Sequence, residues 1–276
     1  MARHSTDERR YDLAQIIVSE GHAKVGQLAE HFGVSTETIR KDLIYLEEEG
    51  IAKKAHGRAF VSSELAERPY TQKLSENARE KVSIAKKAME MIPKRGAIFL
   101  DAGSTIFEFS KLLTLQIGLS IFTNNLTAMP LLAQSNNSVY LVGGKVRSDS
   151  MAIIGDWALD ALNSVQVDVA FLGTDGFLMR EGPCSASFEE VGIKRAMINQ
   201  STSKFLLADY SKFMRNDMFT YAQWKDIDAV ITDDRAPASE LERIGKFTKI
   251  IISSKDEDVS HKTEEPGVLQ DGEVEQ

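Results

Sequence analysis

The sequence predicts an α/β protein, with a small winged helix-turn-helix unit at the N-terminus followed by a larger domain built on a parallel sheet. Two observations lead to this fold class. Short apolar runs rich in Val, Ile and Phe alternate with helical patterns over residues 81–255, as in buried parallel strands with helices on both faces of the sheet. Residues 1–60 contain instead short helical patterns separated by glycines and end in a small basic segment.

Seven apolar runs in the larger section have the length and composition of buried strands. Helical patterns lie between most of them, so strand and helix alternate along the chain. The expected strands are 97–100, 119–123, 139–142, 167–172, 205–208, 229–232 and 248–252, and the expected helices include 104–115, 126–133, 156–162 and 188–198.

Composition divides the chain into four sections. We expect a winged helix-turn-helix domain over 1–60, a polar linker over 61–80, an α/β domain over 81–255 and a tail over 256–276. The tail holds eight acidic residues and one lysine, which accounts for −7 of the formal charge of −8. Such charge with almost no apolar content predicts disorder, and it leaves the rest of the chain nearly neutral.

Composition also excludes several classes of protein. The single cysteine, Cys184, cannot form an internal disulfide, which favours a reducing cytoplasm. The apolar runs are far shorter than the ~18 residues of a membrane span, so we expect no membrane partner. No Cys/His spacing matches a metal site, and we expect neither a metal nor a cofactor.

The N-terminal unit contains the pattern of a helix-turn-helix. Gly33 permits a tight turn after the second helical pattern, and Ser35 is a good N-cap for the third. The apolar residues of the third helix share one face, and they are Ile39, Leu43 and Leu46. A second helix with a polar outer face, placed after a glycine turn, is the arrangement that enters the major groove of DNA.

A basic segment after this helix is typical of a wing that meets DNA phosphates. Residues 51–58 carry two lysines, a histidine and an arginine and no acid, although residues 1–60 as a whole hold nine Lys/Arg against ten Asp/Glu. Alternatively, Arg40 and Lys41 pair with Glu37 on a solvated helix face. The candidate DNA contacts are Ser35, Thr36, Thr38, Arg40 and Lys41 on the helix, and His56 and Arg58 on the wing.

The first strand of the larger domain runs into a short loop, Asp101 to Thr105, that opens a helix. Gly103 lets a ligand approach the backbone, Ser104 and Thr105 supply hydroxyls, and the helix start favours an anion. Asp101 is suited to accept hydrogen bonds from sugar hydroxyls. The plainer interpretation is a turn with an N-cap.

Polar or glycine-rich residues also follow the other expected strands. Ligands of open α/β sheets bind beyond the carboxyl ends of the strands, so these residues favour one binding site at that edge. Besides the 101–105 loop, the candidate ligand contacts are Thr123, Asn124, Gly143, Gly144, Asp175 and Lys194.

Two sets of motifs give the chain a resemblance to a known family. Leu28 to Ser35, Thr38 to Leu43 and His56-Gly57 resemble the winged helix-turn-helix of the DeoR/GlpR family of bacterial regulators. Lys41 stands where that family usually has a second arginine. The motifs at 101–105, 123–124, 143–144, 171–173, 194–197 and 209–213 are similar to the effector domain of the same family.

The resemblance implies a fold similar to ribose-5-phosphate isomerase and an effector that is a phosphorylated sugar or polyol. It implies that Gly103, Ser104 and Thr105 hold the phosphate and that Asp101, Thr123, Asn124, Asp175 and Lys194 line the rest of the site. Asp209 and Lys212 also match the family pattern, with a role left open between ligand contact and loop shape.

Two functions remain to be compared. The first is a cytoplasmic transcriptional regulator, a repressor, that binds a double-stranded operator as a homodimer or homotetramer and has no catalytic residues. The second is a sugar-phosphate isomerase with an accessory N-terminal domain, in which Asp101, Asp175, Glu190 and Lys194 would provide a base and a cation. The helix-turn-helix favours the first.

Overall fold

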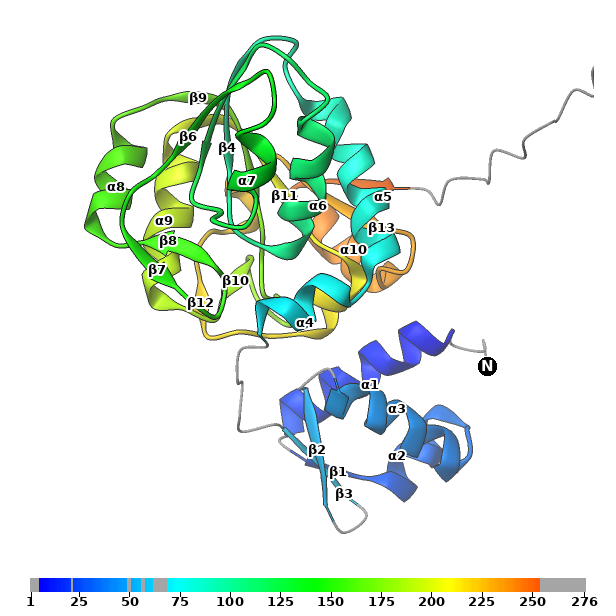
Figure 1. The fold of residues 1–276 in the computed structure, drawn as a ribbon. Helices are drawn as coiled ribbons and strands as arrows, with labels where there is room; N and C mark the ends of the chain where they lie inside the picture. The colour runs from blue at the N-terminus through cyan, green and yellow to red at the C-terminus, as the bar shows by residue number, and fades with distance from the viewer. Residues whose placement is uncertain (1–4, 21, 49–50, 56–57, 62–68, 254–276) are drawn as a thin grey trace, which may run out of the picture.

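The computed structural model describes residues 5–20, 22–48, 51–55, 58–61 and 69–253. Figure 1 shows two units, a small one at the N-terminus in blue and a larger one in which helices lie on both sides of a central sheet. The wing residue His56 and the acidic tail at 256–276 lie outside the described residues.

The small unit has three helices and a three-stranded antiparallel sheet. They are α1 (Thr6–Glu20), α2 (Val25–Phe32) and α3 (Thr36–Glu48), with β1 (His22–Lys24), β2 (Ala52–Ala55) and β3 (Arg58–Val61) in the order β1-β3-β2. Gly33 has φ 63° between α2 and α3, in the left-handed region that glycine adopts without strain. Ser35 Oγ accepts a hydrogen bond from Thr38 N at 3.0 Å, which caps α3 as predicted.

The larger unit contains a seven-stranded parallel sheet, which confirms the predicted fold class. All of the strands that the sequence predicted are in it. Their bounds agree with the prediction to within one residue, except that the strand predicted from residue 205 begins at Ser201. In spatial order they are β14 (Lys249–Ser253), β13 (Ala229–Asp233), β11 (Ser201–Leu207), β9 (Val167–Leu172), β4 (Gly96–Leu100), β5 (Leu119–Thr123) and β6 (Ser138–Leu141).

The order of these strands determines where a ligand can bind. From β4 the chain adds β5 and β6 on one side, then returns to place β9 on the other side of β4. The strand order therefore reverses between β4 and β9, and the connections that leave these two strands diverge. Such a switch point leaves a crevice at the carboxyl ends of the strands, where open α/β sheets bind ligands.

Two apolar layers cover the sheet. Ile98 and Leu100 of β4 pack in the layer that includes α5 and α6, and Phe99 packs in the layer that includes α8 and α9. The helical segments are α4 (Tyr70–Ser75), α5 (Ala78–Ala88), η1 (Met89–Met91), α6 (Ser104–Leu113), α7 (Met129–Leu132), α8 (Asp156–Asn163), α9 (Phe188–Asn199), η2 (Tyr210–Met214), η3 (Trp224–Asp226) and α10 (Ala238–Gly245).

Part of the range expected to be a linker is helical. Residues 70–75 form α4, and α5 begins at Ala78. The buried ammonium group of Lys81 donates to the carbonyl oxygens of Lys73 and Glu76, so a side chain from the next helix satisfies the end of α4. The Tyr70 hydroxyl lies 2.7 Å from Thr127 Oγ1. The contact with Thr127 comes from a distant part of the chain, and the sequence of α4 itself has no apolar periodicity to reveal it.

Candidate functional site

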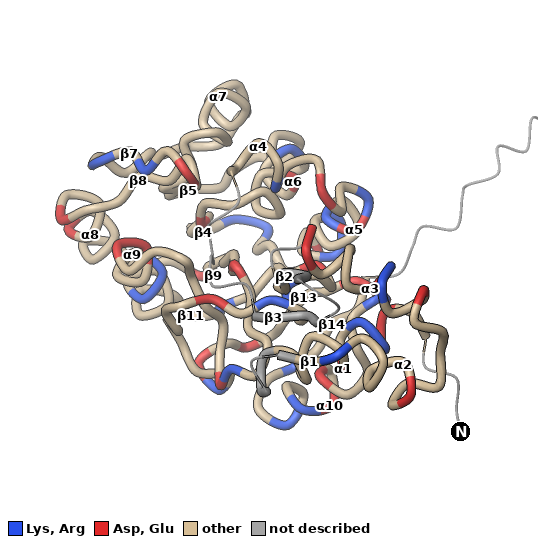
Figure 2. Tube along the Cα trace, turned by 90° about the horizontal axis from the view of Figure 1, so that it is seen from below, with Lys and Arg blue, Asp and Glu red and all other residues tan. Residues whose placement is uncertain are grey.

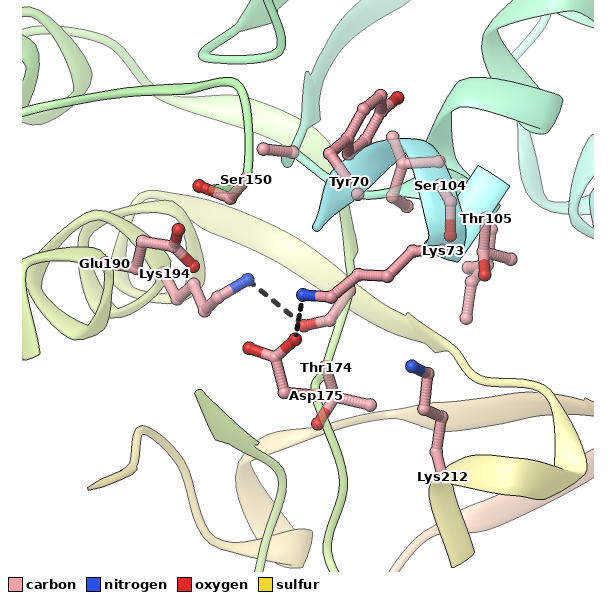
Figure 3. Close-up of a pocket in the computed structure, with 15 residues that line it drawn as sticks. Tyr70, Lys73, Ser104, Thr105, Ser150, Thr174, Asp175, Glu190, Lys194 and Lys212 are labelled. Atoms are coloured by element: carbon pink, nitrogen blue, oxygen red, sulfur yellow. Dashed lines mark hydrogen bonds and ion pairs between the residues drawn. The ribbon is translucent and has the colours of Figure 1, made fainter. Parts of the chain in front are cut away.

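A pocket lies at the switch point, where β4 and β9 end. Its walls come from the start of α6, the loop after β9, α9, α4 and η2. Figure 3 shows the ammonium groups of Lys73, Lys194 and Lys212 directed toward the middle of the pocket. The polar side chains that line it are Tyr70, Lys73, Ser104, Thr105, Ser150, Thr174, Asp175, Glu190, Lys194 and Lys212.

The floor of the pocket is a buried ion pair between Lys194 of α9 and Asp101 at the end of β4. The Asp101 carboxylate also accepts from Gly173 N at 2.9 Å and from Ala102 N at 2.8 Å. Burial acts to lower the pKa of Lys194, but the carboxylates of Asp101 and Glu190 outweigh it and raise the pKa above its usual value. Lys194 is therefore a fixed cation, and Asp101 lies beneath the pocket with its acceptors engaged.

A second ion pair crosses the pocket. Lys73 Nζ of α4 lies 2.9 Å from Asp175 Oδ1 in the loop after β9, and Figure 3 shows the lysine reaching across to it. Burial acts to raise the pKa of Asp175, but the nearby ammonium groups of Lys73 and Lys212 hold it below its ordinary range. Both lysines thus hold Asp175 as a carboxylate, and both belong to short helical segments outside the sheet.

The start of α6 supplies the features that an anion requires. Gly103 has φ 138° and, among the described residues, no side chain caps this helix. The first N–H groups of a helix have no partner within it and carry its positive dipole end. Ser104 and Thr105 lie there at the pocket wall.

Five of the predicted ligand residues do not line this pocket, and one of them, Asp101, lies beneath it. The Thr123 hydroxyl donates to Leu100 O at 2.7 Å, and Asn124 Nδ2 donates to Ile153 O at 3.3 Å. A Cβ at Gly144 would approach Ile154 O to 2.4 Å, so the glycine is needed for the close pairing with β8 (Ala152–Ile154). Gly143 precedes it in the same turn. These residues shape the strand ends around the pocket.

Several lining residues were missing from the predicted site. Glu190 was considered only as part of an isomerase, and Lys212 only as a match to the family pattern. In the structure the buried Glu190 accepts from Ser185 Oγ at 3.1 Å and lies 3.4 Å from Arg147 Nη1. Burial raises the pKa of Glu190, and the Lys194 ammonium group offsets part of that rise. Tyr70, Lys73 and Ser150 had no sequence signal, because nothing local shows that their segments approach the sheet edge, whereas Thr174 adjoins the predicted Asp175 and was overlooked.

The predicted reading helix presents a polar outer face. Thr36, Arg40 and Lys41 are exposed on α3, and Thr38 is partly exposed. Arg40 Nη1 lies 3.4 Å from Glu37 Oε2 with both side chains more than half exposed, and such exposed pairs contribute little to stability. Figure 2 shows basic and acidic residues interspersed along the trace of this unit.

A buried carboxylate orients this helix. Asp42 of α3 is 2% exposed and accepts from Arg9 Nε at 2.7 Å and Arg10 Nε at 3.1 Å, both on α1. The apolar face predicted from periodicity is confirmed, because Ile39, Leu43 and Leu46 are at most 1% exposed. Arg58 lies in β3, next to β2 in the wing.

A helix-turn-helix unit joined to a domain with an anion-suited pocket defines a ligand-responsive DNA-binding regulator. Comparison with protein families agrees with this class. Residues 9–64 match the DeoR-like helix-turn-helix domain, and residues 76–234 match the DeoR C-terminal sensor domain. The chain belongs to the DeoR family of transcriptional regulators.

Relatives of known name cover most of this chain. The glycerol-3-phosphate regulon repressor of Escherichia coli K12 is 33% identical over 236 residues, 85% of this chain and 94% of the relative. The transcriptional regulator GlpR of Haloferax volcanii is 30% identical, with 86% of this chain and 93% of that protein covered. The lactose phosphotransferase system repressor of Staphylococcus epidermidis is 27% identical, with 88% and 98% covered.

Solved structures were also compared. Ribose 5-phosphate isomerase A of Methanocaldococcus jannaschii is similar with a TM-score of 0.38 and 19% identity, covering 50% of this chain and 55% of the isomerase. Within the described part of the chain, no helix is both long and apolar enough to cross a membrane.

Proposed function

We propose that this chain is a transcriptional repressor whose affinity for operator DNA is controlled by a small phosphorylated sugar or polyol bound in the pocket at the β4/β9 switch point. The observation that carries the proposal is the pairing of the uncapped start of α6 with the ammonium groups of Lys73 and Lys212 across one pocket. The printed names of the relatives, which include a glycerol-3-phosphate regulon repressor, support the same class of effector.

The pocket offers separate partners for the two parts of such a ligand. The phosphate binds at the backbone N–H groups of α6 with the hydroxyls of Ser104 and Thr105, since a helix N-terminus favours an anion. The sugar or polyol hydroxyls donate to the carboxylates of Asp175 and Glu190. Asp101 acts through the floor, because its oxygens are engaged by Lys194 and backbone N–H groups.

DNA recognition is assigned to α3 and the wing. Arg40 and Lys41 are the groups on α3 able to reach base edges and phosphates, with the exposed Thr36 beside them. Ser35 and Thr38 share a hydrogen bond of 2.9 Å at the start of the helix and so also fix its direction. His56 and Arg58 are proposed to contact flanking phosphates.

The pocket is proposed to have no catalytic activity. An isomerase needs a carboxylate base that is free to take a proton. Asp175 is ion-paired and its pKa is held below the ordinary range, which makes it a weak base. Incubation with phosphosugars followed by analysis for isomerised product tests this proposal, and turnover that depends on Glu190 would overturn it.

Binding to an operator also has consequences for the oligomeric state of the protein and for the cellular compartment in which it acts. Half-sites related by two-fold symmetry match a symmetric protein, so we propose a homodimer or homotetramer acting in the cytoplasm, where the DNA is. Light scattering of the full chain, alone and with DNA, measures the assembly. A monomer bound to a single half-site would contradict it.

The proposed function is tested by two measurements on the full chain. In-vitro selection from random duplexes yields the operator, and calorimetry with glycerol 3-phosphate, hexose phosphates and their unphosphorylated parents identifies the effector class. We expect a selected sequence with two half-sites and binding of phosphorylated compounds only. Equal binding of phosphorylated and unphosphorylated compounds would show that the pocket does not recognise the phosphate group.

A further inference from the structure

One short segment, η2, lies between the pocket and the DNA-binding unit. Lys212 of η2 lines the pocket, and Tyr210 of the same segment is buried. A 3₁₀-helix has about three residues per turn, so side chains two positions apart project in different directions. The α1 helix of the DNA-binding unit packs against η2. The same five residues thus contact both the ligand site and the DNA-binding unit.

The contacts on the DNA-binding side centre on Tyr210 and Arg235. The Tyr210 hydroxyl lies 3.2 Å from that of Tyr45 on α3. The Arg235 guanidinium lies 3.6 Å from the centre of the Tyr210 ring. Its Nε and Nη2 donate to both carboxylate oxygens of Asp7 on α1 at 3.2 and 3.3 Å, and Nη1 lies 3.4 Å from Glu80 of α5. A bidentate pair of this kind fixes orientation as well as adding attraction.

The reading helix takes part directly in this interface. The Arg10 guanidinium lies 4.0 Å from the centre of the Tyr45 ring, so Tyr45 is held between α1 and η2. Arg40 and Lys41 precede Tyr45 by about one turn on α3. Tyr45 therefore docks α3 on the larger domain.

On the pocket side, η2 is bonded to the loop that carries Asp175. The carbonyl oxygen of Lys212 accepts from Phe177 N at 3.1 Å, two residues after Asp175. Asp209, just before η2, accepts from Asn77 Nδ2 at 3.0 Å, which links η2 to the turn between α4 and α5. The two lysines that attract Asp175 therefore lie on segments that are tied to each other.

We propose that η2 couples occupancy of the pocket to docking of α1 and α3. An anion at the start of α6 attracts Lys212 and Lys73 and weakens their hold on Asp175. The movement of Lys212 draws η2 toward the pocket and away from Tyr45, which loosens the contacts of Tyr210 and Arg235 with the DNA-binding unit. This coupling rests on the proposed effector site, and it specifies how that site regulates DNA binding.

The test uses the full chain, the operator found by selection, and glycerol 3-phosphate with inorganic phosphate as probes. Arg235→Gln removes the contacts to Asp7 and the Tyr210 ring, and Tyr45→Phe removes only the hydroxyl between α3 and η2. Lys87→Gln is the matched control, because it removes a surface cation that pairs with Glu90 outside both sites. Thermal unfolding confirms that each variant is folded.

In the wild type and in Lys87→Gln, we expect an ester that binds to change the operator dissociation constant by about fivefold or more, the usual lower range of such coupling. In Arg235→Gln the ester should bind as in the wild type, but the change should fall below about twofold. Tyr45→Phe should give an intermediate change. Hydrogen exchange of α1 and α3 should increase with ester in the wild type and in Lys87→Gln, but not in Arg235→Gln.

Two failures are distinguishable. Full coupling in Arg235→Gln and Tyr45→Phe, with the ester bound, would overturn the role of η2 and leave the proposed function standing. A wild type that binds the operator but neither probe nor any other phosphate ester would overturn the proposed effector class, and the inference with it.

Discussion

The floor and the outer wall of the pocket differ in how their charges are held. On the floor, Asp101 and Lys194 form a buried pair braced by backbone groups of the sheet. On the wall, Lys73 and Lys212 come from α4 and η2, short segments outside the sheet that face Asp175. The floor is fixed by the fold, and we propose that the wall responds to the ligand, so that a single site both binds and signals.

The largest effect should follow from breaking the floor. Asp101→Ala leaves the Lys194 ammonium group buried without its main partner, and such a loss typically costs about 3–5 kcal/mol in the free energy of unfolding. Chemical denaturation measures it. Adding Lys194→Met to Asp101→Ala should recover part of the loss, because no unpaired charge remains. A loss below about 1 kcal/mol for Asp101→Ala would show that the floor is not a rigid support.

Asp233 supports the wall segment η2, and its contribution to the free energy of unfolding should depend on pH. Asp233 accepts from Tyr210 N at 2.8 Å and Arg235 N at 3.1 Å. Burial, with the neighbouring carboxylates of Asp209 and Glu80, raises its pKa to about 6. A raised carboxyl pKa favours the folded state while Asp233 is protonated in both states, below about pH 4, and this contribution is lost as pH rises through 6.

Between pH 4 and pH 8 the wild type should therefore lose up to about 3 kcal/mol relative to Asp233→Asn. Asparagine cannot accept both hydrogen bonds, which shifts the free energy of unfolding of Asp233→Asn by an amount that does not depend on pH. Denaturation of both proteins at several pH values measures the difference. A difference that stays constant with pH would place the titration of Asp233 in its ordinary range.

The reading helix offers a prediction that is independent of the pocket. Arg40→Ala should weaken binding to the selected operator by about 1–3 kcal/mol if Arg40 reads a base. Glu37→Gln is the matched control, since it removes only the exposed partner of Arg40 and should not weaken binding. Fluorescence anisotropy with labelled operator gives both values. Unchanged affinity when Arg40 and Lys41 are both replaced by alanine would exclude α3 as the reader.

The smallest effect concerns the start of α6. Thr105→Val keeps the shape of the side chain and removes its hydroxyl, so affinity for a phosphate ester should fall by about 1 kcal/mol, the usual net value of one hydrogen bond. Ser110→Ala is the control, because the Ser110 hydroxyl donates to Ile106 O within the same helix away from the pocket. Calorimetry that shows equal losses for the two variants would attribute the effect to the helix and not to the ligand.

The sequence was most informative where local pattern determines structure. Continuous apolar runs can only be satisfied by burial, so the strands of the sheet were predictable, and Gly103 to Thr105 could be placed at a strand end from their order alone. Lys73 could not be predicted, because α4 depends on the buried Lys81 of the next helix and on Tyr70 meeting Thr127, which lies far away in sequence.

The polar residues at the sheet edge show a second limit. The sequence places Thr123 and Asp175 equally well after strands. In the structure Thr123 bonds to the backbone of β4, whereas Asp175 faces the pocket. The direction of a side chain at a strand end is set by neighbouring strands and helices, which a single sequence does not reveal.

The most direct test of the central claim measures operator affinity with and without glycerol 3-phosphate, in the wild type and in a variant carrying both Lys73→Met and Lys212→Met. We predict that the wild type responds to the ester and that the variant still binds the operator but no longer responds. Addition of unphosphorylated glycerol should leave the operator affinity of both proteins unchanged. A variant that responds as the wild type does, at the same concentration of ester, would show that the effector binds elsewhere.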